Sequence, residues 1–469
     1  MASQGSISDK EMLSLAHAVS NTPPLTSKGR FWQRFSGRDR RNVGWWESAR
    51  AIFFVSWINS LLIFIPLAWA SHYDDWGHRT TFSLCFLAII PLEKLFDWGG
   101  EQMTMYLGKG LGDLVVVTLH NAVEATLAII LLLKCDLKLL QSTITGVVLL
   151  HLLLIPGTAF FTGGARVREQ MLHPHRAQLN LTLLTVGVLA LTILAAFFAA
   201  TDINNNGSEI ATALSDKVRG DFLRISRGFA VILLVIYVGS LFYLHDPPGA
   251  NNAFMPHPDD PAEVRRMEYE LKEAKPEVNP WACLILLAIT VALTGVTAEF
   301  LVDSIEFVRE RDNIEEEWFG IILLPIVSFS ADATIAVTYF THHLLKAFFR
   351  SSLKPQRPES LAQARSIDMS IQFLLFWMPF VTLLGWWTNK PMSMLFDLFE
   401  VVLLVGACFL VNYVTADAKT NWAEGSILIA FYAMIGLSAW YYTGQNEVRI
   451  VNACTSVATA LLEGVEDSH

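Results

Sequence analysis

Long apolar runs separated by short polar connections make up most of the chain. An α-helix needs about 20 such residues to cross about 30 Å of hydrocarbon. Eleven runs approach that length, at residues 51–70, 81–97, 114–133, 143–162, 179–200, 227–244, 281–303, 319–340, 367–387, 397–414 and 425–442. The second run holds Glu93, Lys94 and Asp97 near its end, so we expect it to continue as a helix with a polar face. The pattern therefore predicts an all-α, polytopic membrane protein with 11 transmembrane helices.

The composition agrees with a membrane protein. Apolar residues make up 53% of the 469 residues and charged residues 17%, compared with about 25% charged in a typical soluble domain. These values argue against a disordered protein, a nucleic-acid-binding protein and most soluble enzymes. The five cysteines are scattered, without a Cys-x-x-Cys pair, and three of them lie in apolar runs. We expect them to pack inside the protein rather than to form disulfides or a zinc site.

The distribution of basic residues predicts the orientation. Cytosolic loops of membrane proteins carry an excess of Lys and Arg. If the N-terminus is cytosolic, the cytosolic segments contain 22 of the 34 Lys and Arg residues. We therefore predict a cytosolic N-terminus, and the odd number of spans then places the C-terminus in the lumen.

The long connection at 245–280 divides the chain after the sixth span. It leaves one helix followed by two sets of five, which suggests a duplication. The predicted organisation is a basic cytosolic tail (1–48), the first helix with its lumenal loop (49–80), a first repeat of spans 2–6 (81–244), an acidic cytosolic loop (245–280), a second repeat of spans 7–11 (281–443) and a lumenal tail (444–469).

The third and eighth spans contain related sequences. Residues 120–129 read HNAVEATLAI and residues 328–337 read SFSADATIAV, so Glu124 aligns with Asp332. Because the two spans are five helices apart, they cross the membrane in opposite directions, and the duplication is an inverted repeat. In transporters of that architecture, the ion sites lie near the bilayer midplane at the interface between the repeats.

A carboxylate inside the membrane is costly to insert and is a functional hypothesis by default. Two of them at related positions would form a site for a divalent cation or a proton. A hard cation such as Ca²⁺ takes about 6–8 oxygen ligands. The further oxygen ligands that we predict are Asn121, Thr126, Ser328 and Ser330. The alternative is that each carboxylate joins neighbouring helices as a structural contact.

Four segments carry a recognisable family pattern. They are FLAIIPLEKLF (86–96), GDLVVVTLHNAVE (112–124), TAEFLVDSIE (297–306) and SIQFLLFWMPFVTLLGWW (370–387). They resemble the cation/calcium exchanger superfamily, and within it the fungal-type vacuolar calcium/proton exchangers, over residues 45–445. The resemblance implies that the second and seventh spans move as gates, with Glu101 and Glu299 as candidate gating or proton-binding groups. Acids at span ends are also ordinary membrane-interface residues, and this alternative stays open.

The ion-binding motifs depart from the family pattern. His120 stands where the family has Gly, His151 where it has Asn, and Asp332 where it has Glu. Imidazoles favour nitrogen-preferring metals or a titrating group over Ca²⁺, although a lone buried His more often packs as a neutral ring. The residues that we add to the predicted cation- and proton-binding set are His120, His151, Ser370 and Gln372, with Glu124 and Asp332 as the metal ligands.

The resemblance implies a secondary transporter rather than an enzyme. Cytosolic Ca²⁺ would exchange for protons from an acidic vacuole by alternating access, with cation and proton competing for the same carboxylates. The implied partners are the metal cation, the proton and the lipid bilayer, without nucleic acid and without a cofactor, since no segment resembles a phosphate-binding loop for ATP. Two alternatives stay open: exchange of another cation, such as Mn²⁺ or a monovalent ion, and a diverged membrane paralogue that transports nothing.

Overall fold

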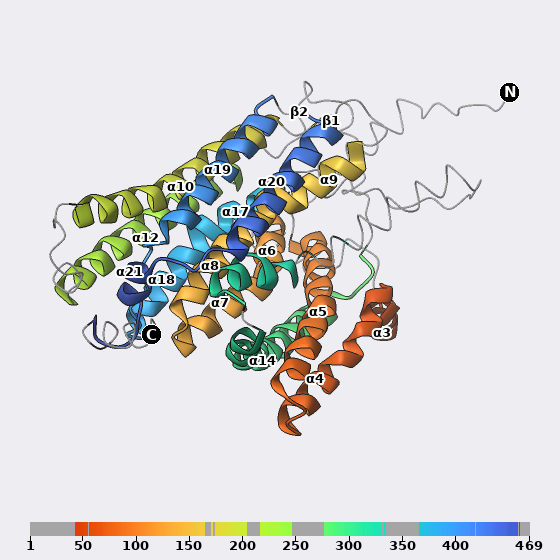
Figure 1. Cartoon of the computed structure of the whole chain (residues 1–469). Coiled ribbons are helices and arrows are strands. Elements are labelled where there is room, and N and C mark those ends of the chain that lie inside the picture. The colour runs from red at the N-terminus through yellow and green to blue at the C-terminus, as the bar shows by residue number, and fades with distance from the viewer. Residues whose placement is uncertain are drawn as a thin grey trace, which may run out of the picture.

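The computed structural model is built almost entirely of helices, which confirms the predicted all-α class (Figure 1). It describes residues 43–54, 56–107, 109–164, 170–171, 174–203, 216–245, 276–312, 314–327, 329, 333, 365–417, 419–457 and 459. The first half contains α3 (Trp45–Phe54), η1 (Trp57–Ile63), α4 (Phe64–Tyr73), α5 (His78–Leu107), α6 (Lys109–His120), α7 (Ala122–Lys134), α8 (Leu137–Leu149), η2 (Leu150–Leu154), α9 (Ile155–Gly164), α10 (Pro174–Ile203) and α12 (Asp216–His245).

The second half contains α14 (Pro280–Asp312), α15 (Glu316–Trp318), η3 (Phe319–Leu323), α17 (Arg365–Gln372), η5 (Phe373–Trp377), α18 (Met378–Trp387), α19 (Leu398–Thr415), α20 (Trp422–Trp440) and α21 (Asn446–Val451). Two short strands, β1 (Gln170–Met171) and β2 (Lys419–Thr420), pair antiparallel. The segment η1 is a 3₁₀ helix, whereas η2, η3 and η5 are π-helical turns inside longer helices.

Most of the predicted spans are helices that could cross a membrane. Within the described residues, seven helices are long and apolar enough, or nine if two sharply bent pairs each count as one span. The bent pairs are α3 with η1–α4 and α6 with α7, which we had expected as continuous helices. The second predicted span is α5, a 30-residue helix that keeps its charged groups. The eighth predicted span, 319–340, starts at η3, and most of its second half lies outside the described residues, so the total of eleven stays a prediction.

Contacts between distant segments gather the predicted lumenal connections at one end of the bundle. Arg219, at the start of α12, donates from Nη1 to the carbonyls of Ala453 (3.1 Å) and Thr455 (2.8 Å) near the C-terminus. At the opposite end, β1 pairs with β2, and the Tyr106 hydroxyl donates to the Val278 carbonyl over 2.7 Å. Strictly alternating spans require this separation of the connections.

One expectation about the cysteines is wrong. Cys135, which follows α7, forms a disulfide with Cys454, which follows α21. The pair is separated by 319 residues, so nothing in the local sequence pattern indicated it. Cys85, Cys283 and Cys408 are free and buried, as expected of packing residues.

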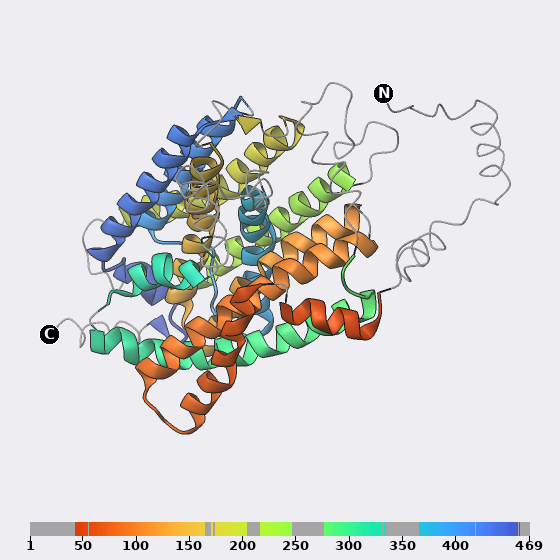
Figure 2. The ribbon, with the colours of Figure 1, turned by 90° about the vertical axis from the view of Figure 1, so that its right-hand side faces the viewer.

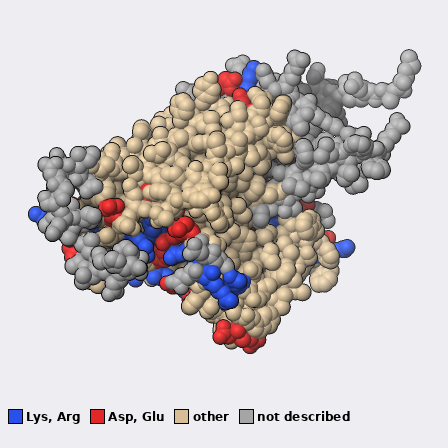
Figure 3. All heavy atoms as spheres, viewed as in Figure 1, with Lys and Arg blue, Asp and Glu red and all other residues tan. Residues whose placement is uncertain are grey.

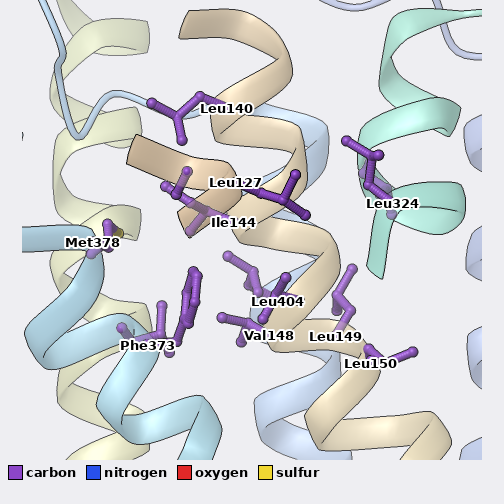
Figure 4. Close-up of a cluster of buried hydrophobic side chains, with 14 of the residues drawn as sticks. Leu127, Leu140, Ile144, Val148, Leu149, Leu150, Leu324, Phe373, Met378 and Leu404 are labelled. Atoms are coloured by element: carbon purple, nitrogen blue, oxygen red, sulfur yellow. The ribbon is translucent and has the colours of Figure 1, made fainter. Parts of the chain in front are cut away.

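The centre of the bundle is formed around α8, whose residues are all buried. Because every side of α8 is covered, its polar side chains must find hydrogen-bond or ion-pair partners inside the bundle. Figure 4 shows apolar side chains from several helices meeting there. The labelled residues are Leu127 of α7, Leu140, Ile144, Val148 and Leu149 of α8, Leu150 of η2, Phe373 of η5 with Met378 of α18, Leu324 beyond η3, and Leu404 of α19.

The outer helices expose large apolar side chains. Figure 3 shows a broad zone without Lys, Arg, Asp or Glu, with the charged residues gathered at its margins. Such a surface is too large and apolar for contact with water and suits lipid hydrocarbon. The exposed apolar residues of the outer helices include Leu189, Ile193 and Phe197 of α10, Val231, Ile232 and Val235 of α12, and Val402, Phe409 and Tyr413 of α19.

Two glycines let α8 and η3 meet backbone to backbone. A Cβ atom on Gly146 would overlap the Ile321 carbonyl and lie 2.6 Å from the Ile321 Cα. A Cβ atom on Gly320 would lie 2.6 Å from the Cβ of Ser142. Small residues at such crossings allow close helix packing inside membranes.

We expect Gly146→Ala to destabilise the protein by at least about 1–3 kcal/mol, because the added methyl group forces the two backbones apart. The melting temperature in detergent measures this loss. Gly239→Ala, on α12, is the matched control because no atom lies within 4 Å of its added Cβ. Equal melting temperatures for the two variants would contradict the close packing of α8 and η3.

Candidate cation and proton site

The third predicted span is broken at its centre. The helix directions of Leu114–His120 and Ala122–Lys134 differ by 55°, and Asn121 stands at the break with φ −93° and ψ 8°. Glu124 lies in the first turn of α7, and 1% of it is exposed. Broken helices with polar residues at the break form the ion sites of many transporters. The break therefore places Asn121 and Glu124 where such a site is expected.

Asn121 joins the two predicted repeats. Its Nδ2 donates to the Gln372 Oε1 over 2.8 Å and to the Met369 carbonyl over 3.3 Å. The Gln372 Nε2 in turn donates to the Thr118 Oγ1 over 2.9 Å. The structure thus brings together two predicted site residues that are 251 positions apart.

The other half of the Asn121 amide is an open acceptor. Its Oδ1 is buried and has no hydrogen-bond partner within the described part of the chain. Burying an amide oxygen without a partner costs about 1–3 kcal/mol. A cation or a donor from outside the described residues would remove that cost, and carbonyl-type oxygens are ligands that Ca²⁺ prefers.

Two π-helical turns flank this region at related positions of the repeats. In the fourth span, η2 contains His151, which is 2% exposed and whose Nδ1 has no hydrogen-bond partner among the described residues. In the ninth span, η5 begins directly after Gln372. Ser370 links the two spans, because its Oγ lies 3.4 Å from the Val148 carbonyl that it donates to. Such π-helical turns are frequent at functional sites.

His120 is held between two acceptors. Its Nδ1 lies 2.8 Å from the Val116 carbonyl and its Nε2 lies 3.2 Å from the Asp97 Oδ1 on α5. This geometry is that of a ring bonded inside the bundle, and a ligand role for His120 stays a prediction. The sequence analysis did not predict Asp97 as the partner of His120, although a carboxylate within an apolar run indicates that a polar partner lies nearby. Thr126 turns to its own helix, where its hydroxyl donates to the Ala122 carbonyl over 2.7 Å.

The predicted partner of Glu124 belongs to the eighth span. Asp332, Ser328 and Ser330 lie outside the described residues, so their approach to Glu124 stays a prediction. Their described neighbour Phe329 packs against the hydrophobic core. Among the described residues, no three His, Cys, Asp or Glu side chains converge on a point that could hold a metal ion.

The two candidate gating acids lie on a pair of packed helices. Figure 2 shows α14 running along α5. The Cys283 thiol donates to the Gly99 carbonyl over 3.2 Å, so Glu101 lies near the level of Cys283. Glu299 lies about 24 Å further along α14 at 1.5 Å per residue. Both acids are exposed, and they stand at different depths along the two helices.

A second group of charged residues was missed in the sequence. The Lys138 Nζ lies 2.6 Å from the Glu317 Oε1, 3.4 Å from the Asp397 Oδ2 and 3.9 Å from the Glu400 Oε1. We call these four residues the Lys138 cluster. Each stands near the start of an apolar run, where a single charge is ordinary. Only the fold reveals that they meet.

Comparisons with known proteins agree on one family. The sodium/calcium exchanger protein family matches residues 79–245 and 282–441. A vacuolar calcium ion transporter of Cryptococcus neoformans is 32% identical and aligns with 90% of this chain and 78% of its own length. A Ca²⁺/H⁺ antiporter of Synechocystis is 30% identical over 81% of this chain and 96% of its own. The native structure of YfkE shares the fold, with a TM-score of 0.61 at 21% identity over 82% of this chain and all of that one.

Proposed function

This chain belongs to the sodium/calcium exchanger protein family, and on that premise we propose that it exchanges cytosolic Ca²⁺ for lumenal protons across the vacuolar membrane by alternating access. The relatives bear the names of vacuolar calcium transporters and Ca²⁺/H⁺ antiporters. The observation that carries the proposal is the broken helix at Asn121, with the buried Glu124 one turn beyond it and the open Asn121 Oδ1 beside it in sequence.

The proposed chemistry is competition for one buried charge. Ca²⁺ would bind the Glu124 carboxylate together with the Asn121 Oδ1 and, from the eighth span, Asp332. When the site faces the acidic lumen, protons would neutralise the carboxylates and release the cation. The hydrogen bond between Asn121 and Gln372 would hold the two repeats in register around the ion, since one residue comes from each. The matched segments 79–245 and 282–441 support the proposed division into repeats at 81–244 and 281–443.

The test is uptake of ⁴⁵Ca²⁺ into proteoliposomes that are acidic inside. We expect uptake that depends on the pH gradient and that a protonophore abolishes. A second candidate, exchange of Mn²⁺ or a monovalent ion, stays open because the imidazole of His151, whose Nδ1 is open among the described residues, is a poor ligand for Ca²⁺. Uptake of Mn²⁺, Na⁺ or K⁺ without Ca²⁺ would support that candidate. If the correctly folded protein takes up none of these ions, the remaining interpretation is a diverged paralogue that transports nothing.

We further propose that the N-terminus is cytosolic. Disulfides persist outside the cytosol, and the Cys135–Cys454 disulfide lies at the end of the bundle that the basic residues predict to be lumenal. After reduction, we expect a membrane-impermeant maleimide to label Cys454 in vacuole vesicles only once they are permeabilised. A cysteine placed by Asp417→Cys, just after α19, is the control and should react without permeabilisation. Labelling of Cys454 in sealed vesicles, with labelling of Asp417→Cys only after permeabilisation, would show that the N-terminus is lumenal.

A further inference from the structure

The Lys138 cluster buries more negative than positive charge. Lys138 is 7% exposed, Glu317 is 1% exposed, and Asp397 and Glu400 are fully buried. If all four groups are ionised, three carboxylates face one ammonium group. A buried charge without a counter-charge is costly and is commonly removed by protonation. The charge balance alone therefore raises the question of where a proton could sit.

The contacts of the Ser142 hydroxyl show which carboxyl groups hold the proton. Its Oγ lies 2.6 Å from the Glu317 Oε2 and 2.7 Å from the Glu400 Oε1. A hydroxyl group carries one hydrogen and can donate to only one of the two carboxyl groups. The other contact is as short as an O–H···O hydrogen bond, so that carboxyl group must carry a proton and donate it to Ser142. One of the two glutamates is therefore protonated.

The third carboxylate does not compete for this proton. The Asp397 oxygens accept from the Phe399 amide (2.9 Å), the Gln445 amide (2.8 Å) and the Tyr442 hydroxyl (2.6 Å). Together with the Lys138 ammonium, these donors fill the acceptor positions of an ionised carboxylate. The Tyr442 phenol, which ordinarily ionises only at about pH 10, keeps its proton as the donor to Asp397.

We propose that Glu317 and Glu400 share one proton through Ser142, and that the Lys138 cluster is a pH-sensitive connection between the two repeats. Lys138 and Ser142 belong to α8 of the first repeat, whereas Glu317 lies in α15 and Glu400 in α19 of the second. With the proton, the cluster carries one unbalanced negative charge. Without it, two unbalanced charges repel each other in a dry interior, and the connection weakens.

Other charged groups lie next to the cluster in the chain: Asp136 precedes Lys138 by two positions, and Glu316 directly precedes Glu317. Asp136, the N-cap of α8, has its pKa raised to about 7, chiefly by burial and by the charge of Glu316, while Arg309 opposes the shift. Arg309 pairs with Glu316 over 3.2 Å. A group whose folded-state pKa is raised stabilises the fold at low pH, and this contribution is lost between about pH 4 and about pH 7. The contribution of Asp136 to the pH dependence of stability must therefore be measured separately, with the variant Asp136→Asn.

The first experiment measures the melting temperature of the purified protein in detergent between about pH 5 and about pH 8. The glutamates of the unfolded chain lose their protons at about pH 4.3. Since the folded protein keeps its shared proton to higher pH, its free energy of unfolding falls as the pH rises. We expect the fall in melting temperature to be smaller in Glu400→Gln, whose amide donates to Ser142 at every pH. Glu306→Gln, an exposed acid on α14, is the matched control and should fall as the unmodified protein does.

The second experiment records infrared difference spectra during the same titration. A shared proton gives the C=O stretch of a protonated carboxylic acid, which Glu400→Gln and Glu317→Gln should remove or shift and Asp136→Asn should leave in place. If the glutamine variants do not fold, Ser142→Ala serves instead and should change the pH at which the band disappears. A band unchanged in all cluster variants, or a melting curve of Glu400→Gln parallel to that of Glu306→Gln, would overturn the proposal. No transported ion is present, so the result is independent of the proposed function.

Discussion

Glu124→Gln is expected to abolish pH-gradient-driven ⁴⁵Ca²⁺ uptake, with a loss of at least about 100-fold. The substitution keeps the size of a side chain that is 1% exposed and removes its negative charge. Removing one partner from a buried pair of opposite charges costs about 3–5 kcal/mol. Since about 1.4 kcal/mol corresponds to a tenfold change in affinity, this cost corresponds to a loss of about 100-fold or more. The same change removes the carboxylate that would carry the returning proton.

Folding has to be kept apart from binding in this experiment. We expect the melting temperature of Glu124→Gln in the absence of Ca²⁺ to stay close to that of the unmodified protein, because the substitution keeps the size of the buried side chain. Added Ca²⁺ should raise the melting temperature of the unmodified protein only, by linkage. Glu306→Gln, exposed on α14, is the control and should keep full uptake. Normal uptake in Glu124→Gln would remove this residue from the site.

Lys138→Met is expected to cost the largest amount of stability, about 3–5 kcal/mol, because it leaves buried carboxylates without their counter-charge. The matched control is Lys134→Met, which breaks the ion pair with Asp303, whose side chains are 31% and 40% exposed. A partly exposed pair is worth about 0–1 kcal/mol. Melting temperatures of both variants, measured side by side, decide the comparison.

Acid should partly restore Lys138→Met. As the pH falls, protonation of Glu317 and Glu400 removes the charges that Lys138 balanced, so the difference from the unmodified protein should shrink. Lys134→Met should show no such recovery. Equal losses in the two variants would show that the Lys138 cluster contributes no more than an ordinary surface pair.

The helices themselves were predictable, because a chain in hydrocarbon must satisfy its backbone hydrogen bonds internally and long apolar runs can do so only as helices. The position of Glu124 in the middle of such a run was equally visible. The break at Asn121 was not, since HNAVEATLAI contains neither Pro nor Gly and reads as one helix. At the break, Asn121 bonds to Gln372 and α17 packs against α6, and both contacts join segments far apart in the sequence.

The sequence alone therefore determined the helical class, the family and one buried carboxylate, because each depends on residues close together in the chain. Tertiary structure decided the partners: Gln372 for Asn121, Cys454 for Cys135 and the carboxylates for Lys138. Asn121 and Gln372 are 251 positions apart, Cys135 and Cys454 are 319 apart, and Lys138 and Asp397 are 259 apart. No local period encodes such a contact, because only the packing of the whole bundle fixes which buried polar groups must satisfy each other.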